Sequence, residues 1–198
     1  MLLNLSRPYT IGVDECGTGA WAGPFVVCAL AVPVDWVPPV GVRDSKKFGT
    51  EHEREVVCGR ILSDPAVVFY LDAPPPAEID EAGLGVRHRA SLARSARLVS
   101  SVVGSVDVVF DGTVNPLSFG RCEPKADSNY SSVAAASIVG KVFRDKLMSR
   151  LALLAPGYGW GTNKGYGSAE HEAGLTSLGV SSWHRKSYAP IRRLLEGR

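Results

Sequence analysis

The sequence predicts an α/β fold in which a central mixed β-sheet is flanked by helices, with a small C-terminal helical region. Early apolar segments rich in β-branched residues indicate strands, and later segments alternate between helical and strand-like patterns. The chain has 198 residues, 45% of them hydrophobic and 21% charged, which is ordinary for an α/β protein with a sizeable core. We therefore expect helices packed on a sheet.

The first part of the chain is expected to supply three strands and one helix. Residues 9–14 and 24–33 read as strands separated by the glycine-rich segment 17–24. Residues 51–63 are expected to be helical, and residues 66–71 to form the third strand.

The second part is expected to be mainly helical. Three prolines at 74–76 break the chain before a helix over about 86–103, whose apolar residues step by three or four: Leu92, Ala96, Val99 and Val103. The elements expected after it are a strand at 106–111, an irregular stretch to 124, a long helix from 127 to about 154, a loop at 157–167 and a short helix near 168–178.

Features that would indicate export or membrane insertion are not evident. The longest apolar stretch, Phe25 to Val34, is too short to span a bilayer, and no basic region precedes an apolar core at the N-terminus. The four cysteines show no Cys-x-x-Cys spacing, which is typical of reduced thiols. A cytoplasmic protein is expected.

Four acidic positions carry the chemical prediction. Asp14 and Glu15 close one apolar run, Asp111 closes another, and Asp127 stands where the long helix opens. Carboxylates at such places are awkward for a core and suit Mg²⁺ or Mn²⁺, two of which would lie roughly 4 Å apart. Because gathered carboxylates repel one another, raised carboxylate pKa values are predicted. Spacing alone is a weak signal, and capping of the helix is the alternative role for Asp127.

Several motifs follow one another in the order of a known family. Segment 14–24, Asp-Glu-Cys-Gly-Thr-Gly-Ala-Trp-Ala-Gly-Pro, resembles the opening motif of type 2 ribonucleases H, the ribonuclease HII family. Further segments are similar to motifs of that family: Arg-Asp-Ser-Lys-Lys at 43–47, Phe-Asp-Gly at 110–112, Lys-Ala-Asp at 125–127 with the helix 134–145, Lys-Gly-Tyr-Gly at 164–167, and His-Arg-Lys-Ser at 184–187. The resemblance covers residues 11 to 192.

This resemblance implies an RNase H-like fold and a monomeric endonuclease without membrane association. It would cut the RNA strand of RNA–DNA hybrids, including single ribonucleotides in duplex DNA, and leave 3′-hydroxyl and 5′-phosphate ends. By position, the metal ligands would be Asp14, Glu15, Asp111 and Asp127, holding two ions. Residues 1–198 would form one catalytic domain, in which a subregion from about 157 to 198 completes the substrate groove.

The resemblance also implies substrate contacts. Backbone groups of Gly17-Thr18-Gly19 would read the 2′-hydroxyl, and Tyr166 would pack on the sugar. The expected phosphate contacts are Lys46, Lys47, Lys164 and Arg185. A solvated lysine and a half-buried core tyrosine are the alternatives. For His171 and His184 we favour structural hydrogen bonding over acid–base catalysis.

Thr18 departs from the family pattern, which usually has arginine between the two glycines. Threonine offers one hydroxyl where arginine offers a charged fork, so weaker binding or a relaxed junction preference is expected. Two alternative functions remain: a hybrid-binding protein with weak cleavage, and an RNase H-like nuclease that acts on DNA.

Two acidic positions are rivals to the predicted ligands. The Asp-Glu-Ala-Gly segment at 80–83 mimics the opening motif, but we assign it to the start of a helix. Asp145 lies eighteen residues beyond Asp127, about 27 Å of helix rise. A salt bridge or surface role is expected for Asp145.

Overall fold

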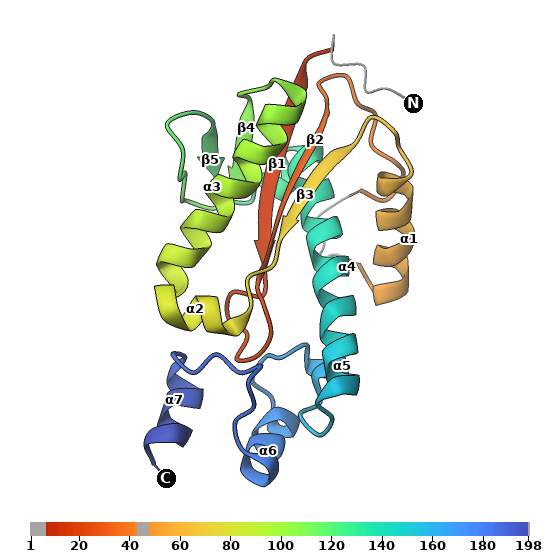
Figure 1. The fold of residues 1–198 in the computed structure, drawn as a ribbon. Coiled ribbons are helices and arrows are strands. Elements are labelled where there is room, and N and C mark those ends of the chain that lie inside the picture. The colour runs from red at the N-terminus through yellow and green to blue at the C-terminus, as the bar shows by residue number, and fades with distance from the viewer. Residues whose placement is uncertain (1–6, 43–47, 198) are drawn as a thin grey trace. The chain divides into compact units, whose positions relative to one another are not determined.

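The computed structural model describes residues 7–42 and 48–197, and Figure 1 labels their helices and strands. The predicted contacts Lys46 and Lys47 lie outside these residues. The chain divides into two compact units, which we describe one at a time. The first comprises the described residues up to Cys16, Val27–Asp72 and Arg89–Val142, and the second comprises Gly17–Val26, Ala73–His88 and the described residues from Phe143 onward.

The first unit is built on a five-stranded sheet with the order β3-β2-β1-β4-β5. Its strands are β1 (Tyr9–Cys16), β2 (Val26–Pro33), β3 (Val68–Asp72), β4 (Val108–Asp111) and β5 (Arg121–Glu123). β1 pairs with β4, and β4 with β5, in parallel, whereas β2 and β3 are antiparallel. The predicted mixed sheet is therefore confirmed, as are its first three strands and β4.

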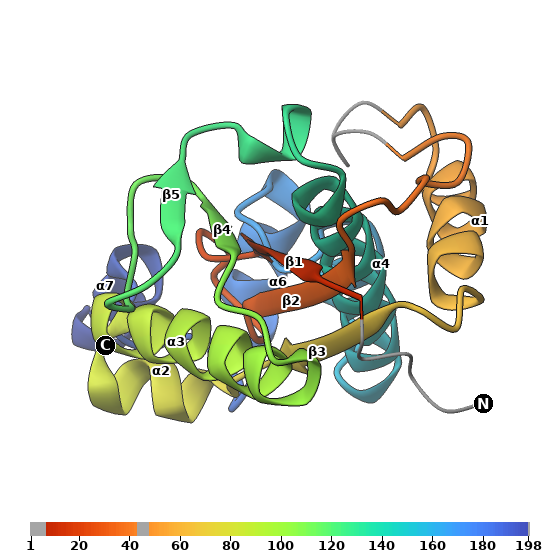
Figure 2. The same cartoon turned by 90° about the horizontal axis from the view of Figure 1, so that it is seen from above.

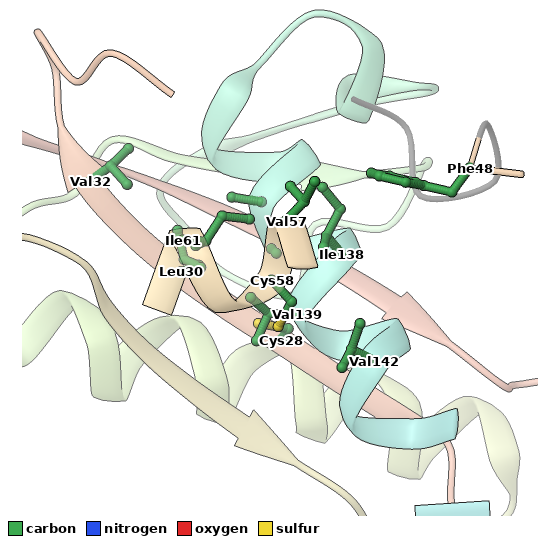
Figure 3. Packing of buried hydrophobic residues seen from close by; sticks show 12 residues of the cluster. Cys28, Leu30, Val32, Phe48, Val57, Cys58, Ile61, Ile138, Val139 and Val142 are labelled. Atoms are coloured by element: carbon green, nitrogen blue, oxygen red, sulfur yellow. The ribbon is translucent and has the colours of Figure 1, made fainter. Parts of the chain in front are cut away.

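Helices lie along both faces of this sheet, and Figure 2 shows α3 (Leu84–Val103) on the side opposite α4 (Ser131–Leu154) and α1 (Glu51–Leu62). Thr50 starts α1 by accepting a hydrogen bond from the Glu53 N–H. Side chains from β2, α1 and α4 form one buried cluster, as Figure 3 shows for Leu30, Ile61 and Ile138. Burial of these apolar side chains is the main force that holds the helices on the sheet.

β1 and α4 approach each other unusually closely at Gly12. A Cβ atom added at Gly12 would lie 2.2 Å from the carbonyl carbon of Ser132 and from the nitrogen of Val133. Only glycine permits that contact between two backbones. The glycine therefore fixes the first turn of α4 against the strand that carries Asp14.

Short helices are the main secondary structure of the second unit: α2 (Pro76–Ala82), α5 (Trp160–Asn163), α6 (Ala169–Leu178) and α7 (Ala189–Glu196). Its apolar cluster includes Trp160, Tyr158 and Met148. The helical region predicted from about residue 157 belongs to this unit, which also takes in earlier segments and the end of α4. Within the described ranges, no helix has the length and apolar character needed to cross a bilayer.

Some predicted boundaries were wrong. The long helix begins at Ser131, and Asp127 lies before it in a separate 3₁₀ turn, Ala126–Ser128, so it does not cap α4. Lys125, with a φ of 62°, reverses the chain ahead of this turn. The segment expected to be irregular contains β5, and the loop expected at 157–167 contains α5.

Candidate functional site

Asp14 and Asp111 are neighbours at the ends of two parallel strands. Their strands pair with Val13 opposite Phe110, so the residues that follow lie at the same level of the sheet. Asp14 is 9% exposed. Its pKa is raised to about 7, mainly by burial and also by the negative charges of Glu15 and Asp111, against the lowering effect of a hydrogen bond from Ser137. The predicted rise in carboxylate pKa is confirmed for Asp14.

Asp111 is linked directly to the turn that carries Asp127. Its Oδ1 accepts a hydrogen bond from the backbone N–H of Ala126, 2.8 Å away. On the neighbouring strand, Glu123 accepts hydrogen bonds from Asn129 Nδ2 at 2.6 Å and from the Tyr130 hydroxyl at 2.9 Å. The 3₁₀ turn is therefore attached at both of its ends to the sheet edge where Asp111 lies.

Carboxylate oxygens are the ligands that Mg²⁺ and Mn²⁺ prefer, so the chemistry of the predicted set fits these ions. Among residues 7–42 and 48–197, however, no three His, Cys, Asp or Glu side chains gather closely enough to hold a metal ion. Among the predicted ligands, Asp14 and Asp111 are the two that lie on directly paired strands. Coordination by all four predicted ligands stays a prediction and requires side-chain movement when an ion binds.

The Gly17-Thr18-Gly19 turn belongs to the second unit, where Gly17 packs closely against a buried arginine. Gly17 has a φ of 83°, and a Cβ at this position would lie 1.9 Å from Nε of Arg144. A Cβ at Gly19 would meet nothing within 4 Å. Close packing therefore requires glycine at position 17, whereas the exposed Gly19 leaves room for a bound molecule.

Arg185 is the side chain that holds this turn. Its guanidinium donates hydrogen bonds to the carbonyl oxygens of Gly17 and Thr18, both at 2.8 Å, and of Gly23 at 2.9 Å. The side chain is fully buried, and burial is the main cause that lowers its pKa. The predicted phosphate contact stays a prediction, because the structure gives Arg185 a role that needs no nucleic acid.

The Lys-Gly-Tyr segment is also well anchored. Lys164 is only 6% exposed, and its Nζ donates to the Gly161 carbonyl at 2.6 Å and to Ser149 Oγ at 3.0 Å. Tyr166, by contrast, is 39% exposed, and the Arg144 guanidinium lies 5.2 Å from the centre of its ring. Of the two predicted contacts, Tyr166 is the one whose side chain reaches the surface.

Sequence reasoning missed several supporting residues. Asp80, which mimics the opening motif, lies near the end of α2, so the helix start expected at 80–83 was wrong; its carboxylate accepts hydrogen bonds from the backbone N–H groups of Lys186 and Ser187. The buried Arg144 donates to the carbonyls of Pro24 and Lys164. Asp145 is 6% exposed, so a surface role for it was wrong. The sequence carries no signal for the hydrogen bonds of Asp80 and Arg144, because their partners are distant along the chain.

Trp21 and the two histidines have internal roles. The Trp21 ring fills the space beside Gly167, where a Cβ would lie 2.2 Å from the indole. His171 and His184 are buried and hydrogen-bonded to each other, which confirms the predicted structural role.

Comparison with known proteins agrees with these motifs. The sequence model of the family described as Ribonuclease HII matches residues 11–191. The chain belongs to the ribonuclease HII family. It is 42% identical to a ribonuclease HII of Jannaschia sp. over 94% of this chain and 92% of the relative. A ribonuclease HII of Thermus thermophilus is 40% identical over 91% and 86% of the two chains. As a family member the chain is a ribonuclease H, a hydrolase that acts on RNA strands.

Solved structures support the fold. The chain is similar to ribonuclease H2 from Pyrococcus horikoshii, with a TM-score of 0.78 and 23% identity over 96% of this chain and 98% of the other. It is also similar to Bst-RNase HIII in complex with Mn²⁺, with a TM-score of 0.76 and 23% identity over 98% and 71% of the two chains. The predicted RNase H-like fold is confirmed.

Proposed function

We propose that the chain is a metal-dependent endonuclease that cuts the RNA strand of RNA–DNA hybrids and cuts at single ribonucleotides in duplex DNA. The observation that carries this proposal is the pairing of Asp14 and Asp111 at adjacent strand ends, with Asp14 buried among further negative charge. A buried carboxylate in such surroundings gains most from a nearby cation. The products would carry 3′-hydroxyl and 5′-phosphate ends.

The proposed ligands for two Mg²⁺ or Mn²⁺ ions are Asp14, Glu15, Asp111 and Asp127. Bound ions would orient and activate water and stabilise the leaving 3′ oxygen. The protein's own contribution is to hold the carboxylates on rigid supports: Asp14 and Asp111 on paired strands, and Asp127 on a turn attached to Asp111 through Ala126. Support for the ion type comes from the similar Bst-RNase HIII, which is in complex with Mn²⁺.

Ribose recognition is proposed for the Gly17-Thr18-Gly19 turn together with Tyr166. The carbonyls of Gly17 and Thr18 accept hydrogen bonds from Arg185, which orients the peptide groups without help from the Thr18 side chain. Such a turn could present its N–H groups to a 2′-hydroxyl. Lys46, Lys47, Lys164 and Arg185 remain the proposed phosphate contacts, with Lys164 and Arg185 restricted by their burial.

Further proposals concern the domain organisation, the location and the oligomeric state of the protein. We propose that residues 1–198 act as one catalytic domain, with the subregion from about 157 completing the substrate groove, and that the protein is a cytoplasmic monomer. None of the four cysteines forms a disulfide in the structure, which agrees with a reducing compartment.

The test is cleavage of a DNA duplex that carries one ribonucleotide, with Mg²⁺ and Mn²⁺ supplied in turn and the cut mapped at nucleotide resolution. We expect cutting beside the ribonucleotide only when a divalent ion is present. An all-DNA duplex of the same sequence is the matched control, and its cleavage would favour the DNA nuclease instead. Tight binding of the hybrid without turnover would favour the hybrid-binding protein suggested by Thr18.

A further inference from the structure

A buried pair of histidines in the second unit is hydrogen-bonded to Tyr166, the proposed sugar contact. His171 and His184 are 0% and 1% exposed, and their Nε2 atoms lie 3.1 Å apart. Trp160 donates its indole N–H to His171 Nε2 at 3.1 Å. On its other side, His171 Nδ1 lies 2.9 Å from the carbonyl oxygen of Tyr166.

The hydrogen-bond partners determine where the proton of His184 lies. The backbone N–H of Ser181 lies 2.9 Å from Nδ1 of His184. A backbone N–H can only donate, so this Nδ1 accepts and carries no proton. A neutral His184 therefore carries its proton on Nε2 and donates it to Nε2 of His171.

The same reasoning fixes the proton of His171. Its Nε2 faces the indole N–H of Trp160 and the Nε2–H of His184, and both are donors. Nε2 of His171 must therefore accept, which leaves the proton on Nδ1. That proton points at the Tyr166 carbonyl, which can only accept. The two donors share the single lone pair of His171 Nε2, and one arrangement, with both histidines neutral, gives every contact a donor and an acceptor.

Both backbone polar groups of Tyr166, its N–H and its carbonyl, are therefore hydrogen-bonded. Its N–H donates to the Asn163 carbonyl at 3.0 Å, and its carbonyl accepts from His171. Its ring is left partly exposed beside the Arg144 guanidinium. We propose that His171 is a positioning residue for substrate recognition: its Nδ1–H fixes the backbone of Tyr166 and thereby the direction in which the exposed ring meets the sugar. This inference rests on the proposed role of Tyr166.

A rival account makes His171 a core residue that only satisfies Trp160 and His184. The two accounts assign importance to different ring nitrogens, which amide side chains can mimic separately. In His171→Asn, the amide nitrogen falls near the position of Nδ1 and can still donate to the Tyr166 carbonyl. In His171→Gln, the amide group falls near Nε2 and can serve Trp160 and His184, while the Tyr166 carbonyl loses its donor.

The experiment measures kcat and KM for a duplex with one ribonucleotide, together with thermal melting of each variant. We expect His171→Asn to keep kcat/KM within about threefold of wild type, and His171→Gln to lose about tenfold, mainly in KM, as one lost hydrogen bond predicts. Tyr158→Phe is the matched control, because it removes one hydrogen bond, to the Gly179 carbonyl at 3.0 Å, from the same cluster. It should lower the melting temperature and leave kcat/KM within about twofold.

A double-mutant cycle with Tyr166→Ala completes the test. If His171 acts through Tyr166, His171→Gln should cost less than about twofold in kcat/KM once the tyrosine ring is gone. Additive losses, or equal losses in the Asn and Gln variants, would overturn the inference. Should His171→Gln fail to fold, the Asn variant decides alone: a loss of about tenfold or more with an intact fold would overturn it. Turnover by the wild-type protein tests the proposed function separately. If the wild-type protein does not cut the duplex, the proposed function is wrong, whatever the variants do.

Discussion

Nη1 of Arg185 lies 2.8 Å from the carbonyl oxygen of Thr18, although 167 residues separate the two in sequence. The same oxygen also accepts a hydrogen bond from the hydroxyl of Tyr188. The main chain of the Gly-Thr-Gly turn is thus fixed by buried donors behind it. The identity of the side chain at position 18 can change without changing the direction of the peptide groups.

This relationship predicts the effect of Arg185→Lys. Lysine cannot reproduce the fork that serves three carbonyls, and hydrogen bonds from charged groups contribute about 1.5–3 kcal/mol each. We expect kcat/KM for a hybrid to fall by about 10- to 100-fold. The neighbouring exposed Lys186 supplies the control: Lys186→Gln removes a positive charge, which Arg185→Lys retains, and should change kcat/KM by less than about threefold. Equal effects of the two substitutions would show that the hydrogen-bonding fork of Arg185 has no special part in activity.

Thr18→Arg tests the departure from the family pattern. Because Arg185 fixes the turn, the new side chain should project from an unchanged backbone and add a phosphate contact. Affinity for a hybrid should rise, and the slope of log Kd against log salt concentration should steepen by about 0.7 to 0.9 for one added contact. Binding titrations at several salt concentrations measure both. An unchanged affinity, slope and cleavage pattern would refute the predicted effect of threonine.

Asp111→Asn should abolish cleavage and preserve the fold. The amide oxygen can still accept the Ala126 N–H, so the 3₁₀ turn keeps its attachment while the negative charge is lost. We expect kcat to fall by at least about 100-fold, with circular dichroism and melting close to wild type. Asp107→Asn is the control, since it also removes a carboxylate charge, from an exposed partner of Arg121 that directly precedes β4. Near-normal turnover of Asp111→Asn would remove this residue from the site.

Gly12→Ala should destabilise the first unit. Its Cβ would overlap backbone atoms of Ser132 and Val133, which cannot rotate away, so we expect a loss on the order of 3 kcal/mol in the free energy of unfolding. Gly85→Ala provides the contrast, because a Cβ at Gly85 in α3 meets nothing within 4 Å. That substitution should be neutral or stabilise by up to about 1 kcal/mol. Urea unfolding of both variants measures the difference, and equal stabilities would contradict the close β1–α4 contact.

Stability at mildly acid pH should depend on His184. Burial, aided by the neighbouring His171, lowers its pKa from 6.5 to about 4, so below pH 6.5 the unfolded chain binds a proton that the folded chain does not. The uncharged His184 therefore contributes on the order of 3 kcal/mol to the free energy of unfolding. This contribution is complete above about pH 6.5 and is lost progressively as the pH falls to about 4. In His184→Gln, the free energy of unfolding should depend less steeply on pH between about 4 and 6.5, as urea unfolding at several pH values would measure.

The raised pKa of Asp14 acts in the opposite direction. The folded state holds that proton more tightly, so Asp14 alone makes stability fall as the pH rises from 3.8 to about 7. The prediction for His184 therefore concerns the difference between variant and wild type at each pH. An identical slope in both proteins would contradict it.

The positions of Asp14 and Asp111 could be predicted because each follows an apolar run, and parallel strands bring such ends together. β5 could not, because Arg121–Glu123 is only three residues long and gains its conformation from pairing with β4. The burial of Lys164 and Arg185 could not be predicted from the sequence either. Cationic side chains are usually solvated, and these two can be buried because backbone carbonyls accept hydrogen bonds from them.

The attachment of the Gly-Thr-Gly turn to Arg185 has a consequence for biosynthesis. A nascent chain emerging from the ribosome contains the turn from its first two dozen residues, but it acquires the donors that shape the turn only when residues 185–188 have been made. Carboxylates that could bind ions would thus be synthesised long before the turn is ordered. Ribose discrimination should be among the last properties that the newly made enzyme acquires.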